Sequence, residues 1–205
     1  MTATAVVPAR RPVLADAVLP RTRVTDALLV GAGVLVMALL AQVEIPLPLV
    51  PITGQTLGVL LVGAALGARR GALSLAAYAV VGLLGAPVFA GFAGGPATVL
   101  SPSFGFILGF VPAAAVAGWM AERAWDRQPL RAAAGFLAAS AIPFLTGVPY
   151  MAAIVNLVMG EPMGLQAALA AGLWPFIPGG IVKALLAAAL IPLAWKGVRA
   201  LDARR

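Results

Sequence analysis

Long runs without a charged residue alternate along the chain with short clusters of basic residues. Residues 71–121 carry no charge, and the other charge-free runs cover 27–43, 45–68, 132–160 and 162–182. A helix needs about 20 apolar residues to cross the hydrocarbon core of a bilayer. Divided at glycine and proline breaks, the runs predict six membrane-spanning helices near residues 26–43, 54–68, 71–86, 104–126, 130–159 and 177–198.

The composition points to the same class of protein. The 205 residues are 62% hydrophobic and 10% charged, whereas soluble domains average about 45–50% and about 25%. We therefore expect an all-α integral membrane protein, a compact six-helix bundle over residues 26–199. The chain contains no Cys and no His, which excludes the common zinc, haem and thiol-nucleophile sites. We expect no metal and no cofactor.

The basic residues predict the orientation of the bundle. Thirteen of the 14 Lys and Arg residues lie in four segments that six helices place on one side. Cytoplasmic segments are enriched in Lys and Arg, so both termini are predicted to be cytoplasmic in a bacterial-type cell membrane. Residues 1–25 are expected to form a flexible basic arm, and residues 200–205 a basic tail. The positive charge does not gather into a patch, and no nucleic-acid partner is expected.

A cleaved signal peptide is the alternative interpretation of residues 21–42. Its apolar run of 17 residues is longer than the usual 7–15, and its removal would break the distribution of basic charge. We therefore favour a first membrane helix.

The loops on the outer side are apolar and rich in Gly and Pro. They cover residues 46–55 (loop 1), 85–103 (loop 3) and 174–180 (the end of loop 5). Long uncharged loops are tolerated at membrane depth where they cover or line a cavity. We expect loops 1 and 3 to form lids over a ligand pocket. The alternative is a re-entrant plug that binds no ligand.

Lys183 is the one basic residue away from the cytoplasmic side. A charge within the membrane is costly and indicates a functional site, here a cation for an anionic ligand group such as a carboxylate. Snorkelling to the outer headgroups is the alternative. The few polar residues predicted toward the outer side would complete a small pocket with Lys183. They are Thr53, Gln55, Thr56, Tyr78, Ser101, Ser103 and Asn156.

Three segments resemble the BioY family, the biotin-specific substrate-binding components of energy-coupling factor (ECF) vitamin transporters. The segments are residues 50–56 (VPITGQT), residues 71–95, and residues 175–179 followed by Lys183. The middle segment is the most specific, and it carries Tyr78, Phe89, Gly91, Gly94 and Gly95. The likeness extends from about residue 27 to residue 195.

The resemblance implies a six-helix bundle that captures biotin from the outer side and delivers it for uptake. It implies a binding subunit without ATPase motif or enzymatic activity, whose partners are a coupling membrane protein and two ATPase subunits. The biotin-binding residues expected on this basis are Lys183, Gln55, Thr53, Tyr78, Phe89, Gly91, Gly94, Gly95, Asn156 and Gly180.

One position departs from the family pattern. The family has an Asp three residues before the Lys, and this chain has Gly180 there. Without that carboxylate, Lys183 in the empty pocket needs another counter-ion, and Glu44 or Glu161 can serve. We hypothesise that the uncompensated cation attracts the valerate carboxylate of biotin.

Docking of partners is expected at the first helix, where small residues four apart allow close packing of another helix. Ala27 and Gly31 have this spacing, although packing within the bundle explains it equally well. Two other functions stay open, namely capture of a different carboxylate-bearing vitamin and a solitary biotin carrier. An intramembrane enzyme is disfavoured because the seven acidic residues are scattered.

Overall fold

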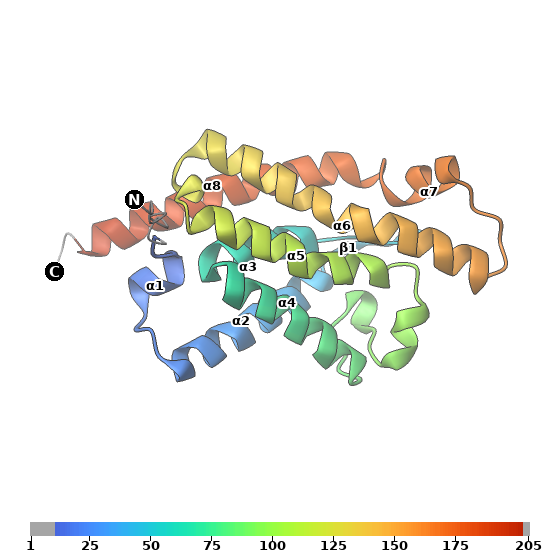
Figure 1. Ribbon diagram of the computed structural model, residues 1–205, viewed down its shortest axis with the longest axis horizontal. Coiled ribbons are helices and arrows are strands. Elements are labelled where there is room, and N and C mark those ends of the chain that lie inside the picture. The colour runs from blue at the N-terminus through green and yellow to red at the C-terminus, as the bar shows by residue number, and fades with distance from the viewer. Residues whose placement is uncertain (1–10, 203–205) are drawn as a thin grey trace, which may run out of the picture.

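The computed structural model describes residues 11–202, which are largely helical (Figure 1). The helices are α1 (Leu14–Val18), α2 (Arg23–Ala41), α3 (Gln55–Leu66), α4 (Ala68–Leu83), α5 (Phe104–Ala121), α6 (Pro129–Leu157), α7 (Leu165–Gly172) and α8 (Phe176–Asp202). Three short 3₁₀ helices lie in the connections, η1 (Ala90–Phe92), η2 (Pro96–Leu100) and η3 (Trp125–Arg127). Strands β1 (Glu44–Ile45) and β2 (Ile52–Thr53) form one antiparallel hairpin.

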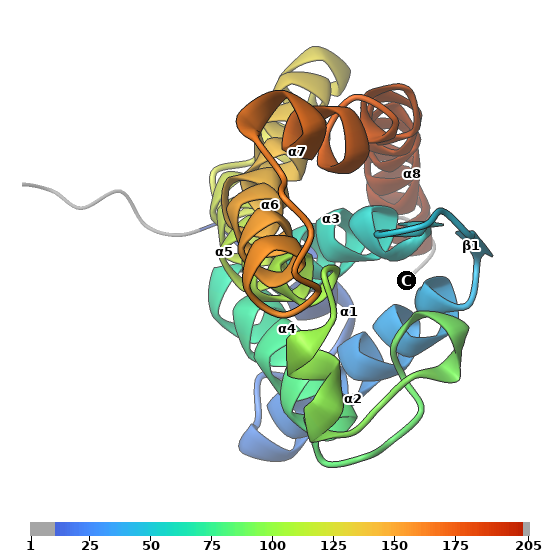
Figure 2. The same cartoon turned by 90° about the vertical axis from the view of Figure 1, so that its right-hand side faces the viewer.

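The bundle is elongated, with α1 and the C-terminal end of α8 at one end and α7 at the other (Figure 1). Helix α5 packs against α6, α3 and α4, while α2 packs on α4 and α8 packs on α6 and α3. Most residues of α3 and α5 are buried. Seen along the long axis, α3 lies between α2 and α8, with the η1–η2 segment in front (Figure 2).

Small residues let α3, α4 and α5 cross closely. A Cβ atom on Gly71 of α4 would lie 2.9 Å from the Cα of Gly63 in α3 and 3.5 Å from the carbonyl oxygen of Ala114 in α5. Such contacts between backbones require glycine or alanine. The crossing positions the N-terminal half of α3 beside the centre of the bundle.

Four helices within residues 11–202 are long and apolar enough to span a membrane, α2, α5, α6 and α8. Helix α3 is apolar but has 12 residues and α4 has 16, which correspond to about 18 and 24 Å at 1.5 Å per residue. Both are shorter than the roughly 30 Å hydrocarbon core.

The boundaries differ from the predicted ones in two instructive places. Helix α5 ends at Ala121 rather than near residue 126, because Ala124 adopts a left-handed conformation with φ +60°. Residues 165–172, expected to lie in loop 5, form α7. That segment is apolar throughout, so its pattern does not separate a short helix from a loop lying on the bundle.

In the described part of the N-terminal arm, residues 11–25, the start of α1 contacts the bundle through Val13 and Asp16. Val13 is 2% exposed and belongs to the cluster that contains Leu60 of α3. Asp16 of α1 pairs with Arg70 of α4 and with Arg21 at 2.6 Å. Burial alone would raise the pKa of Asp16, but the two guanidinium groups lower it overall. Residues 1–10 and 203–205 lie outside the described residues.

Candidate functional site

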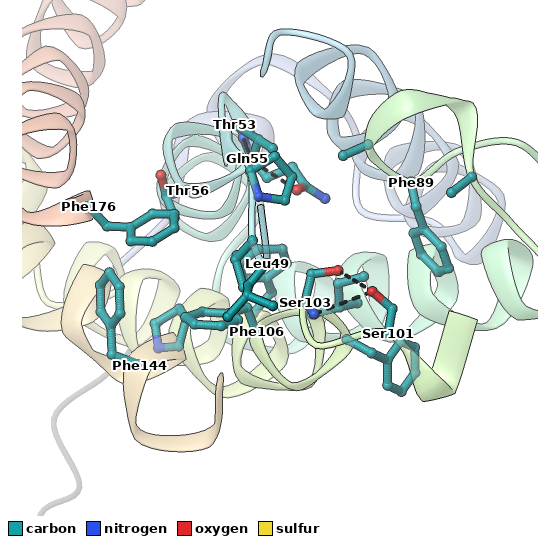
Figure 3. Close-up of a pocket in the computed structure, with 18 of the residues that line it drawn as sticks. Leu49, Thr53, Gln55, Thr56, Phe89, Ser101, Ser103, Phe106, Phe144 and Phe176 are labelled. Carbon is teal, nitrogen blue, oxygen red and sulfur yellow. Dashed lines mark hydrogen bonds between the residues drawn. The ribbon is translucent and has the colours of Figure 1, made fainter. Parts of the chain in front are cut away.

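A cavity of about 290 Å³ lies between the β2–α3 junction, the η1–η2 segment, α5, α6 and the start of α8. Ligand pockets range from about 300 to 1,000 Å³, so this one suits a small molecule. Phe106, Phe144 and Phe176 face one another at one end of the cavity and Phe89 lies at the other (Figure 3). The lining also includes Leu49, Thr53, Gln55, Thr56, Ala90, Ala93, Thr98, Ser101, Ser103, Phe110, Pro143, Gly180 and Lys183.

A chain of hydrogen bonds fixes the polar wall of the cavity at the start of α3. The hydroxyl of Thr53 donates to Oε1 of Gln55 at 2.9 Å, and Nε2 of Gln55 donates to the hydroxyl of Tyr78 at 2.7 Å. The Tyr78 hydroxyl in turn donates to the carbonyl of Val88 at 2.9 Å. Both ends of the Gln55 amide are therefore occupied, and its orientation is set before any ligand arrives.

Lys183 lines the cavity from the second turn of α8. Its ammonium donates a hydrogen bond to the backbone carbonyl of Thr53 at 2.6 Å. It makes no ion pair with any residue in the described part of the chain. The counter-ion expected from Glu44 or Glu161 is therefore not found. Glu44 lies in β1, with its carboxylate near Gly91, and Glu161 is exposed in the α6–α7 connection.

The η1–η2 segment covers the cavity and is fastened to the bundle from both sides. Gln42, just after α2, donates to the carbonyl of Phe89 at 3.0 Å and accepts from the amide of Phe92 at 3.0 Å. Tyr150 of α6 donates to the carbonyl of Val99. The ring of Phe89 packs edge-on against Tyr78 at 5.3 Å. This segment belongs to loop 3, the expected lid, and it lines the cavity through Phe89, Ala90, Ala93 and Thr98.

The three glycines predicted to bind the ligand lie in the lid segment, where the backbone itself requires glycine. Gly91 and Gly95 have φ angles of +64° and +92°, a region that favours glycine because it has no Cβ. Gly94 lies so close to the carbonyl of Ala86 that a side chain would not fit. None of the three lines the cavity, whereas their neighbours Ala90 and Ala93 do.

The structure brings five predicted binding residues to the cavity wall, namely Thr53, Gln55, Phe89, Gly180 and Lys183. Tyr78 is fully buried behind Gln55 and positions it. Asn156 does not line the cavity. Its side chain accepts from the amide of Met163 at 2.9 Å and donates to the carbonyl of Met163 at 3.1 Å. It therefore fastens the α6–α7 connection.

Sequence reasoning missed several residues of the site. In the sequence Gln42 is an ordinary polar residue at the end of a predicted helix. Only the folded structure shows that its side chain hydrogen-bonds Phe89, 47 residues later in the chain. Phe144 and Phe176 look like core residues in so apolar a chain. Thr56, by contrast, was expected in the polar set of the pocket and lines the cavity, and its hydroxyl is buried with no hydrogen-bond partner among the described residues.

The residues predicted to dock a partner are accessible. Ala27 and Gly31 are both exposed on α2, and a Cβ atom at Gly31 would meet nothing within 4 Å. Neither residue is used to pack α2 against the bundle.

A helical bundle with an internal, mostly apolar cavity and a single ammonium on its wall defines a membrane protein that binds a small molecule. A sequence model described as the BioY family matches residues 12–200. The chain therefore belongs to the BioY family and is an integral membrane protein.

Named relatives agree with this assignment. The chain is 33% identical over 183 residues to "Biotin transporter BioY" of Rhizobium etli, covering 86% of this chain and 94% of the relative. It is 39% identical over 143 residues to "Biotin transporter BioY" of Rhodobacter capsulatus, covering 67% and 74%. The crystal structure of the S-component for biotin from an ECF-type ABC transporter aligns with a TM-score of 0.63. That alignment covers 86% of this chain and 95% of the other at 24% identity, and it shows the shared fold.

Proposed function

We propose that this protein captures biotin from the outer side of the cell membrane and delivers it for uptake as the substrate-binding subunit of an ECF-type transporter. Family membership and the relatives named as biotin transporters support this function. The role is binding and transport, not catalysis.

One observation carries the proposal, the ammonium of Lys183 on the wall of an otherwise neutral cavity. The remaining lining is aromatic, aliphatic or hydroxyl- and amide-bearing, which suits the apolar and ureido parts of biotin. A cation with only a backbone carbonyl as partner favours a ligand that brings its own negative charge. The biotin carboxylate meets that requirement, with Gln55, Thr53 and Thr56 as neutral hydrogen-bonding groups for the rest of the molecule.

The topology that goes with this function has six spans and both termini in the cytoplasm. The spans are α2, α3, α4, α5, α6 and α8, with the short α3 and α4 shielded by their neighbours. The position of α1 and the end of α8 at one end of the bundle, opposite the lid, supports this arrangement. The cavity then opens toward the outer side, where biotin arrives.

Delivery would require a coupling membrane subunit and two ATPase subunits, since this chain has no ATPase motif. The exposed pair Ala27 and Gly31 on α2 favours close approach of a partner helix there. A solitary carrier is the alternative. Biotin uptake by cells that express this chain without any coupling subunit would support that alternative.

Calorimetric titration of the detergent-purified protein with biotin tests the function, with thiamine and riboflavin as control ligands. We expect saturable binding of biotin alone. In Lys183→Met, loss of a hydrogen bond to a charged group, worth about 1.5–3 kcal/mol, lowers affinity about 10- to 150-fold. Lys196→Met, a matched change toward the other end of α8, retains the parent affinity. Equal binding by the parent and Lys183→Met would overturn the role of this lysine.

A further inference from the structure

A second and larger cavity lies at the opposite end of the bundle from the lid. It is a groove of about 1,060 Å³ between α1, α2 and α4, and it shares no lining residue with the biotin cavity. Arg11, Arg21, Arg23, Arg69 and Arg70 line it together with Asp16, Asp26 and Glu122.

The charges of the groove are only partly compensated. Arg70 pairs with Asp16 and, at 3.2 Å, with Asp26, and Arg21 pairs with Asp16. The side chains of Arg11, Arg23 and Arg69 are exposed and form no ion pair within residues 11–202. The groove therefore presents guanidinium groups that are free to bind an anion.

Below the arginines the walls of the groove are apolar. Along α4 they consist of Leu73, Ala76, Ala77 and Val80, and Val30 of α2 faces them. Leu73 is 49% exposed and Val80 is 54% exposed. From Arg69 to Val80 the helix rises about 16 Å at 1.5 Å per residue, which is about half of the roughly 30 Å hydrocarbon core. The apolar wall therefore has the depth of one bilayer leaflet.

We propose that this groove binds an anionic phospholipid of the leaflet that faces the N-terminal end of the bundle. The phosphate lies between the guanidinium groups of Arg23 and Arg69. A guanidinium group can donate two parallel hydrogen bonds to phosphate oxygens. One acyl chain lies along Leu73, Ala77 and Val80. Charge at one end and a leaflet-deep apolar wall below it fit a lipid better than a free phosphate, which would leave the wall exposed.

Native mass spectrometry of delipidated protein tests the proposal, with added phosphatidylglycerol or phosphatidylcholine of the same acyl composition. We expect preferential retention of phosphatidylglycerol. A basic side chain near an anionic headgroup contributes about 1 kcal/mol, or about fivefold in affinity. The double variant Arg23→Gln/Arg69→Gln therefore loses about 25-fold. The control Arg123→Gln/Arg131→Gln removes the same charge outside the groove and retains the parent preference.

Two further measurements separate a lipid site from simpler explanations. Ala77→Phe fills the apolar wall and weakens phosphatidylglycerol binding while the arginines stay in place. Soluble glycerol 3-phosphate does not displace the lipid at equal concentration, because it lacks acyl chains. Circular dichroism and size-exclusion profiles establish that each variant is folded. Equal retention of the two lipids, equal loss in the control variant, or displacement by glycerol 3-phosphate would each overturn the proposal.

Discussion

Lys183 of α8 donates its hydrogen bond to the carbonyl of Thr53, a residue 130 positions earlier in the chain. This bond joins the start of α8 to the junction of β2 and α3, across the wall of the cavity. Thr53 also orients Gln55 through its hydroxyl. A ligand carboxylate that approaches Lys183 therefore reaches the point where two walls of the cavity meet.

The contribution of the Lys183 charge to biotin binding can be tested by placing a carboxylate at position 180, where the family pattern has an Asp. Gly180 lines the cavity, and a Cβ atom there would meet nothing within 4 Å, so Gly180→Asp is accommodated. An aspartate three residues before Lys183 lies on the same helical face and offsets about 1 kcal/mol of its attraction for an anion. We expect biotin affinity to fall about fivefold by calorimetry.

Two controls make this test specific for charge. Gly180→Asn has the same shape without the charge and retains the parent affinity. Biotinamide, which lacks the carboxylate, binds Gly180→Asp and the parent within about twofold. Tighter binding of biotin by Gly180→Asp would show that the uncompensated cation is not what attracts the carboxylate.

The lid should open faster when its attachment to α2 is removed. In Gln42→Ala the hydrogen bonds to Phe89 and Phe92 are lost, each with a net contribution of about 1 kcal/mol. We expect the dissociation rate of biotin, measured by stopped-flow displacement, to rise about five- to thirtyfold. Gln128→Ala, an exposed change on the far side of the bundle, leaves the rate unchanged. If both variants release biotin at the parent rate, Gln42 does not restrain the lid.

Asn156 and Tyr78 are expected to have different roles. Asn156 stabilises the α6–α7 connection, whereas Tyr78 positions the side chain of Gln55. Asn156→Ala removes bonds that hold the α6–α7 connection, so thermal stability falls while biotin affinity stays within about twofold. Tyr78→Phe leaves the Gln55 amide and the Val88 carbonyl without their buried partner, at a cost of about 1–3 kcal/mol. We expect biotin affinity to fall at least about fivefold in Tyr78→Phe. The opposite ranking of the two affinities would show that Asn156 contributes to biotin binding.

The sequence anticipated what depends on local pattern. Charge-free runs located the long helices within a few residues, and the lone intramembrane charge singled out Lys183. It failed where a contact joins distant segments, as in the reach of Gln42 across 47 residues to Phe89. It also treated Gly91, Gly94 and Gly95 as ligand contacts, although the backbone conformation of the lid is what requires them. From the sequence alone, a glycine required by close contact with a ligand cannot be distinguished from one required by close contact with another backbone segment.

Two aspartates outside the membrane-spanning segments predict opposite responses of stability to pH. Asp126 in η3 is 1% exposed and accepts a hydrogen bond from the indole of Trp195 at 2.6 Å. Burial raises its pKa, and the Trp195 bond and the charge of Arg127 offset this only in part. The folded state thus favours the protonated carboxyl. Its contribution to stability is greatest at low pH and falls as the pH rises through the folded pKa.

Asp16 behaves in the opposite way, because Arg21 and Arg70 bring its pKa below the ordinary value. Its contribution is complete above the unfolded pKa, about 3.9, and is lost as the pH falls through the folded pKa. We expect thermal midpoints in detergent, measured from about pH 3 to about pH 8, to reveal the contrast. The parent loses stability relative to Asp126→Asn as the pH rises, and relative to Asp16→Asn as the pH falls. Parallel curves for the parent and Asp126→Asn would contradict the raised pKa, since a carboxyl with an ordinary pKa in both states gives no slope.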